Sequence, residues 1–152
     1  MRAPRAGDAF SLASAMRPED AAEVRVQGRE LLAAVEDSLR LSELSFAVEA
    51  GGELLALGGV APGPAATALG PREYDLVWLL TTNAVPRHKG AFWRESLRVV
   101  TGLLRAYPVL LAHVDARYDA ALRWAERLGG LVCPAVPWGA SGELFHPVVW
   151  RA

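Results

Sequence analysis

The residues best suited to chemistry lie where an apolar segment runs into a long amphipathic one, over Thr81–Phe92. Arg87, Lys89 and Gly90 come directly before the amphipathic segment. Free backbone N–H groups and the dipole at a helix start favour a bound anion, and basic side chains add to that preference. The junction is therefore either a phosphate-binding turn or an ordinary strand-to-helix connection, and these residues alone support both equally.

Other chemically capable residues form no recognisable motif. No two of His88, His113 and His146 are spaced three or four residues apart, so no metal site is predicted. Ser141 follows a glycine–alanine pair and lacks the G-x-S-x-G order of a nucleophile elbow. Cys133 is the single cysteine, which excludes an internal disulfide, and its apolar surroundings predict a buried, inert thiol. We assign no catalytic residue on this basis.

Three arginines of the long amphipathic segment, Arg94, Arg98 and Arg105, fall together on a helical wheel opposite the apolar stripe. They either contact an acidic partner or DNA, or simply keep the helix surface hydrated. Glu95 lies off to one side, so we expect this face to be unneutralised. Trp138 and Trp150 are candidate exposed interface anchors, with capping of the sheet edge as the alternative.

Hydrophobic periodicity predicts the elements that position these residues. We expect helices over 18–28, 31–39, 86–107 and 118–128, and a weak strand at 10–13. Further strands are expected around Phe46 and Val48 and over 54–60, 75–82, 109–114, 131–136 and 144–150, with a long loop at 61–73. The segment 75–82 is predicted to be buried on both faces.

Two strand–helix–strand crossings indicate an α/β or α+β fold. We predict one mixed sheet of six or seven strands, with about four helices packed on both faces. The expected central core is Trp78, Leu80, Phe92, Val99, Leu103, Leu111, Leu122 and Leu128.

The chain has 152 residues, of which 52% are apolar, and this is the size and composition of one globular domain. Sixteen basic and seventeen acidic side chains give a net charge of −1, which argues against attachment to nucleic acid or membrane by bulk charge. No apolar run is long enough for a membrane-spanning helix, and no signal peptide is recognised at the start.

The order of elements resembles the GNAT superfamily of N-acetyltransferases. Residues Arg87–Phe92 match its pyrophosphate loop, [R/Q]-x-x-G-x-[G/A], at Arg87 and Gly90, with Phe92 at a small-residue position. Residues 121–130 are similar to its A-x-x-L-Y-E-K-L-G-F helix end, but Ala125 replaces the tyrosine that protonates the leaving thiolate. Tyr118 takes the place of the usual asparagine.

The resemblance implies a single GNAT-like domain over residues 1–152, with Arg87, Lys89 and Gly90 contacting phosphate if acetyl-CoA binds. The departures predict weak or absent cofactor binding and an inactive site. Chemically able bases are Glu53, Asp75 and Asp115, and spacing selects none of them.

A narrower likeness covers roughly residues 8–147. Over this range the chain resembles small proteins of short-tailed phages, namely the internal virion protein A and virion-assembly proteins. The resemblance lies in the segments 16–20, 78–82, 92–96, 114–117 and 142–145. This implies a structural module without a cofactor, located in the virion or the host cytoplasm, with head, portal or tail proteins as partners. The alternative is an acetyl-CoA-dependent N-acetyltransferase acting on an amine.

Overall fold

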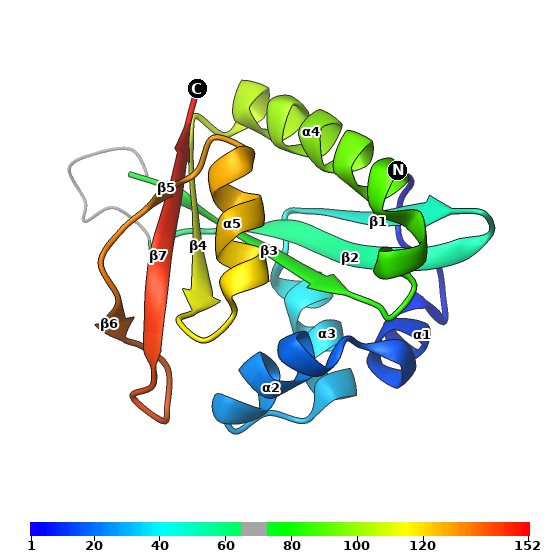
Figure 1. Cartoon of the computed structure of the whole chain (residues 1–152), viewed down its shortest axis with the longest axis horizontal. Helices are drawn as coiled ribbons and strands as arrows, with labels where there is room; N and C mark the ends of the chain where they lie inside the picture. Colours follow the sequence, from blue (N-terminus) through cyan, green and yellow to red (C-terminus); the bar gives the residue numbers. More distant parts are fainter. Residues whose placement is uncertain (65–72) are drawn as a thin grey trace.

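The computed structural model describes residues 1–64 and 73–152, and Figure 1 shows a central sheet with helices on either side. The helices are α1 (Asp8–Ala15), α2 (Pro18–Val26), α3 (Leu31–Leu41), the 3-10 helix η1 (Val85–His88), α4 (Lys89–Ala106) and α5 (Asp119–Arg127). The strands are β1 (Leu44–Ala50), β2 (Glu53–Pro62), β3 (Asp75–Thr81), β4 (Val109–Asp115), β5 (Leu131–Val132), β6 (Val136–Pro137) and β7 (Leu144–Arg151).

Within the described residues the strands form one mixed sheet of seven, in the order β1-β2-β3-β4-β7-β5, with β6 beside β7. The β3–β4 pair is parallel and the other pairs are antiparallel. Helices α1–α3 gather on one face, and α4 and α5 lie on the other (Figure 1). The predicted mixed sheet with helices on both faces is confirmed, and the described part has five α-helices where we expected four.

The N-terminal segment contradicts one expectation, since residues 10–13 belong to helix α1 and form no strand. Gly7 adopts φ 90° immediately before this helix, and Asp8 lies in its first turn. Leu12 is fully buried against the neighbouring helices. Four alternating residues are too few to separate a strand from one helical turn, and the tertiary packing of Leu12 decides the outcome.

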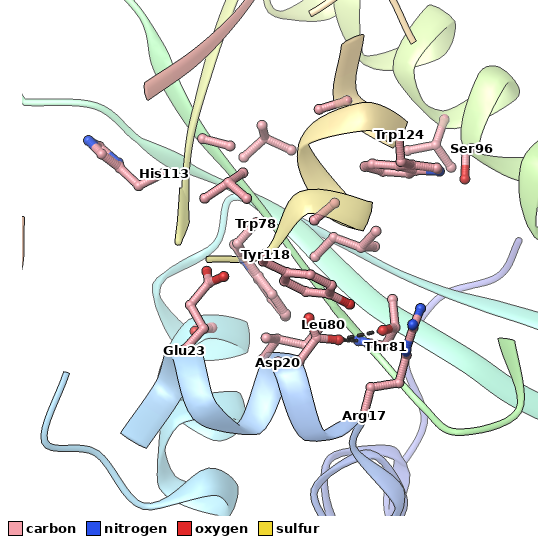
Figure 2. A pocket seen from close by; sticks show the side chains of 18 of the residues that line it. Arg17, Asp20, Glu23, Trp78, Leu80, Thr81, Ser96, His113, Tyr118 and Trp124 are labelled. Carbon is pink, nitrogen blue, oxygen red and sulfur yellow. Dashed lines mark hydrogen bonds between the residues drawn. The ribbon is translucent and has the colours of Figure 1, made fainter. Parts of the chain in front are cut away.

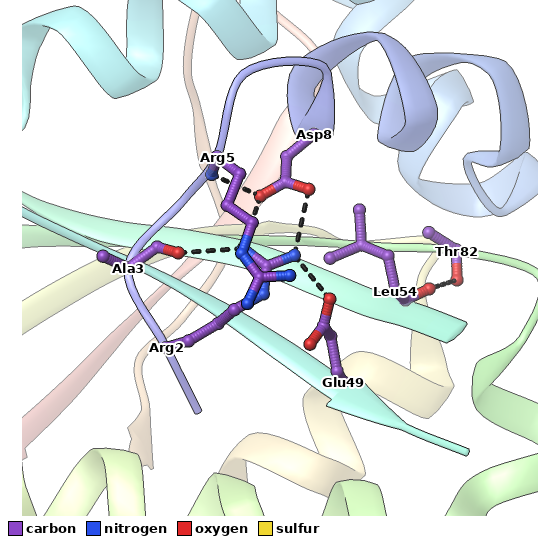
Figure 3. A network of polar contacts seen from close by, with 7 residues as sticks. All are labelled: Arg2, Ala3, Arg5, Asp8, Glu49, Leu54 and Thr82. Atoms are coloured by element: carbon purple, nitrogen blue, oxygen red, sulfur yellow. Dashed lines mark hydrogen bonds and ion pairs between the residues drawn. The ribbon is translucent and has the colours of Figure 1, made fainter. Parts of the chain in front are cut away.

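A polar network ties the segment before α1 to the sheet (Figure 3). Arg2 forms a single antiparallel bridge with Ala47 of β1. Its guanidinium donates to the Asp8 carboxylate at 2.7 and 3.0 Å and to Glu49 at 2.5 Å. The backbone N–H of Arg5 also donates to Asp8, at 2.6 Å. Asp8 is therefore satisfied although it is buried.

Strands β1 and β2 form the predicted hairpin, whose turn contains Gly51 at φ 57° and Gly52 at φ 77°. Strand β2 extends to Pro62, so part of the segment expected to be loop is strand. Residues 63, 64 and 73 are not strand, as expected, and residues 65–72 of that loop lie outside the described residues.

Strands β3 and β4 pair at only two positions, Asp75↔Leu110 and Leu76↔Leu111, and then diverge. Most of β3 is consequently half-buried, and the expectation of burial on both faces is wrong. Of the predicted core, four residues are buried, namely Phe92, Val99, Leu103 and Leu128. Trp78, Leu80, Leu111 and Leu122 are partly exposed, and the first three line the space that the divergence opens.

The C-terminal strands are shorter than expected over 131–136. Pro134 has no N–H to donate to a ladder, and it separates the two-residue strands β5 and β6. Strand β7 pairs along the whole length of β4. None of the helices in 1–64 and 73–152 has the length and apolar character needed to cross a bilayer.

Candidate functional site

A cavity of about 860 Å³ occupies the gap between β3 and β4 and is lined from both faces of the sheet. On one face its wall includes Arg17, Asp20 and Glu23 of α2. On the other face it includes Phe92 of α4 and Trp124 of α5. The volume lies within the range typical of small-molecule and cofactor sites.

The edge of β3 that faces this gap carries backbone groups without a strand partner. Thr82 turns its N–H to Leu55 of β2, at 2.9 Å. Thr81 turns the other way: its N–H donates to Asp20 at 2.8 Å, and its carbonyl accepts the Arg17 N–H at 3.0 Å. Because successive residues of a strand present their backbone to alternate edges, Leu79 faces the same edge as Thr81. Pairing with β4 has already ended at Leu76, so an extended ligand with amide groups could bind there.

Two carboxylates project from α2 into the cavity, as Figure 2 shows. Asp20 is buried and accepts hydrogen bonds from both the N–H and the hydroxyl of Thr81. Glu23, one turn along, accepts from the backbone N–H of Asp115 at 3.3 Å. Burial raises the pKa of Asp20 and raises the pKa of Glu23 to about 8. Glu23 can therefore exchange a proton near neutral pH.

Tyr118 immediately precedes α5, and its ring lies in the cavity beside Asp20. Figure 2 shows its hydroxyl directed at Thr81 and Asp20. Burial and the charge of Asp20 raise the Tyr118 pKa above its ordinary value, so the hydroxyl keeps its proton at neutral pH. The site thus places a protonated hydroxyl beside a group that can accept a proton.

The start of α4 only partly matches the predicted phosphate-binding turn. Arg87 donates to Glu53 at 2.5 Å, and His88 lies 2.7 Å from the same carboxylate. Lys89 and Gly90 are exposed, and the nearest atom to a side chain added at Gly90 would be a guanidinium nitrogen of Arg94, at 3.6 Å. This helix start is therefore open and basic, with Lys89 and Arg94 beside the first free amides.

Phe92, at the small-residue position of the family loop, turns its ring into the core. Its ring is buried and stacks on Trp124 with centroids 5.8 Å apart and an interplanar angle of 18°. The indole Nε1 of Trp124 is buried with no hydrogen-bond partner among the described residues. A buried donor on a cavity wall is costly unless a ligand or water satisfies it, so it suits a ligand that carries a carbonyl group.

The other predicted interaction residues are separated by the fold. Arg94, Arg98 and Arg105 are exposed, but Glu95 pairs with Arg98 at 2.6 Å, so the expectation of an unneutralised face is wrong there. Trp150 is buried, with 5% exposure, and is not a surface anchor. Trp138 is 36% exposed. Contact of these residues with a partner or DNA stays a prediction.

Two other sequence-based expectations need comment. Cys133 lies between β5 and β6 and is half-buried, so it is less enclosed than expected. Of the three candidate bases, Glu53 is held by Arg87 and His88, and Asp115 is held by Arg117 at 2.6 Å. Asp75 lies at the closed end of the β3–β4 gap. None of the three lines the cavity.

Sequence reasoning missed Asp20 and Glu23, although a signal for them exists. Spaced three residues apart, they share one side of the helical wheel with the buried Val24. The hydrophobic periodicity of α2 is hard to recognise because charged and apolar residues share the side of the helix that faces the protein interior. An acid beside the apolar positions of a short helix was the available indication.

No protein-family model matches the sequence, and no curated protein matches it either. Solved structures do resemble it. The complex of AAC(6')-Ib with ribostamycin and coenzyme A superposes with a TM-score of 0.71 at 14% identity, covering 99% of this chain and 91% of that one. The yncA protein of Salmonella typhimurium with its cofactor acetyl-CoA gives 0.69 at 15% identity, covering 99% and 91%. The GNAT domain of S. lividans PAT gives 0.68 at 17% identity, covering 99% and 89%.

These likenesses extend over almost the whole chain and establish its fold as GNAT-like. At such low sequence identity they establish the fold alone, and the function must be argued from the site.

Proposed function

We propose that the protein is an acyl-CoA-dependent N-acyltransferase that transfers an acyl group to an amine. The observation that carries the proposal is the cavity between the diverging strands β3 and β4, which both Glu23 and Tyr118 line. The coenzyme A and acetyl-CoA complexes among similar folds add support. These observations favour the acyltransferase over the virion module, for which the phage likeness is the only argument and which stays a prediction.

The residues present fit an acyl-CoA. The open, basic start of α4, with Lys89, Gly90 and Arg94, suits its phosphates. The free edge of β3 at Leu79 and the unpartnered Nε1 of Trp124 suit the amide groups of its pantetheine arm. When bound, acyl-CoA supplies an acyl carbon activated as a thioester.

Glu23 acts as the general base in this proposal. A bound ammonium group must first lose a proton to expose the nitrogen lone pair, and the Glu23 carboxylate accepts it, becoming a neutral carboxyl in a site that favours that form. The second proton that the nitrogen loses after attack balances the one that the departing thiolate takes up. Asp20 is held by Thr81 and adds negative charge close by. Both groups favour a positively charged amine over a neutral alcohol in the same cavity.

Tyr118 serves the leaving group. As the carbon–sulfur bond breaks, the sulfur gains charge, and the Tyr118 hydroxyl donates a hydrogen bond to it before solvent or Tyr118 protonates the thiolate. The raised pKa keeps this donor protonated throughout the neutral range. Ala125, at the position of the family tyrosine, lies buried in the core and has no proton to give.

Calorimetry with acetyl-CoA and a thiol-release assay with a panel of primary amines test the proposal. We expect saturable binding and amine-dependent thiol release, both unchanged in the exposed control Glu19→Gln. Tyr118→Phe is expected to lower kcat with little change in acetyl-CoA affinity. Absence of acetyl-CoA binding at millimolar concentration would contradict the cofactor assignment, and would favour the inactive module expected from the sequence.

A further inference from the structure

A stacked aromatic pair forms one wall of the cavity. Trp138 lies against His113 with ring centroids 4.2 Å apart and an interplanar angle of 9°. It also meets Phe145 edge-on at 5.2 Å. Trp138 and His113 both line the cavity, as does Trp78, whose indole donates to Ser42 at 2.8 Å. The ring of Trp138 is thus held by His113 and Phe145, and the ring of Trp78 by Ser42.

The aromatic wall lies close to Glu23. Glu23 contacts the backbone of Asp115, which is two residues beyond His113 and therefore on the same face of β4. From the other side, a side chain added at Gly139 would lie 3.5 Å from Gln27, which is one helical turn beyond Glu23. The Asp115 and Gln27 contacts therefore place Trp138 and Glu23 toward the same end of the cavity.

The charge at this end suits a cation. Burial lowers the pKa of His113, so the stacked pair carries no positive charge at neutral pH. Of the arginines that line the cavity, Arg29 is bound to Asp37 at 2.9 Å, and Arg17 lies 3.8 Å from Glu19 and beside Asp20. Arg127 belongs to the last turn of α5 and is exposed. Glu23 has no basic partner among the described ion pairs.

We propose that this end of the cavity selects an amine that carries an aromatic ring, with the ammonium group against Glu23 and the ring against Trp138. Aromatic rings stack favourably on indole, and an ammonium gains from both a carboxylate and nearby ring faces. The inference rests on the proposed function, because it names the acceptor of the same reaction. Trp138 is then a specificity-determining residue that takes no part in proton transfer.

The test uses the full chain without acyl-CoA and 2-phenylethylamine as the probe, measured by calorimetry at pH 8.5. We expect saturable binding that weakens about fivefold or more in Trp138→Ala and is largely retained in Trp138→Phe, which keeps the stacking surface. Two probes isolate the ligand's parts on the wild-type protein alone: 2-phenylethanol lacks the charge and butylamine lacks the ring. Each is expected to bind at least about fivefold more weakly.

Glu23→Gln is expected to weaken 2-phenylethylamine binding, whereas Glu36→Gln, an exposed site on α3 away from the cavity, leaves it unchanged. Equal affinity for 2-phenylethylamine and butylamine, or full affinity in a folded Trp138→Ala variant, would overturn the role of Trp138. Equal affinity for the alcohol would overturn the role of Glu23. The comparison of the three probes uses the wild-type protein, so its result does not depend on whether any variant folds.

Failure here and failure of the proposed function are distinguishable. Ring-selective amine binding without acetyl-CoA binding would leave an amine site in a protein that is not an acyltransferase. Acetyl-CoA turnover that is as fast with butylamine as with 2-phenylethylamine would keep the acyltransferase and reject the aromatic acceptor.

Discussion

Replacing Glu23 with glutamine tests the electrostatics of the site without any ligand. Glutamine keeps the shape of the side chain, and its carbonyl can still accept from the N–H of Asp115, which Glu23 does at 3.3 Å. The variant therefore removes the ionisation and little else. In the native protein the Glu23 pKa is raised to about 8 from an ordinary 4.5, mainly by burial.

The sign follows from proton binding. Between pH 4.5 and pH 8 the native protein holds the Glu23 proton, whereas the unfolded chain has released it. The native state binds more protons, so the unfolding free energy falls as pH rises through this window. At about 1.4 kcal/mol per pH unit, the loss attributable to Glu23 is on the order of 3–5 kcal/mol. The stabilisation that comes from the Glu23 proton is fully present below pH 4.5, and its loss is complete above pH 8.

Urea denaturation followed by tryptophan fluorescence, at intervals from pH 4.5 to 9, measures this directly. Relative to wild type, Glu23→Gln is expected to gain stability steadily as pH rises, by on the order of 3–5 kcal/mol across the window. Asp20 also has a raised pKa, but both proteins contain Asp20, so its contribution to the pH dependence is removed when the two unfolding free energies are subtracted. Glu19→Gln, on the exposed side of the same helix, is expected to follow wild type. Parallel curves for wild type and Glu23→Gln would refute the buried, neutral carboxyl and, with it, the general base.

Two further predictions concern stability. Leu103 is buried in the core between α4 and the sheet, so Leu103→Ala is expected to lower the unfolding free energy by about 2–5 kcal/mol in urea denaturation, and a loss below about 0.5 kcal/mol would contradict its packing. Arg2→Ala leaves buried Asp8 without its guanidinium partner and is expected to cost about 1–3 kcal/mol at pH 7. Because Arg2 lowers the pKa of Asp8, that difference should shrink as pH falls below 3.8, and a constant difference would count against the ion pair.

Much of the fold could be predicted because its signals are local. The long stripe of α4, the glycine turn at 51–52 and the apolar strands β3 and β4 all follow from periodicity and turn chemistry. Helix α1 could not be predicted in this way, because its identity depends on Leu12 packing against α3 and β2. The divergence of β3 from β4 is likewise invisible in the sequence, since both strands read as continuously apolar.

The candidate site was largely beyond sequence reasoning for the same reason. Its members come from α2, the end of β3, the start of α5 and the β6–β7 loop, and only the fold brings them together. The pKa of Glu23 depends on burial, which no spacing records. Arg87 was identified from its motif as a candidate phosphate contact, yet in the structure its guanidinium forms an ion pair with Glu53, a residue 34 positions away in the sequence.

The replacement of the family tyrosine by Ala125 predicts an inactive protein only if a single position can supply the acid. Tyr118 precedes Ala125 by seven residues and is the non-helical residue immediately before α5. Both line the cavity. A hydroxyl at Tyr118 lies nearer α2, on the side where Asp20 and Glu23 are. In the proposed mechanism the proton donor is therefore displaced toward the acids, and the alanine at position 125 does not remove it.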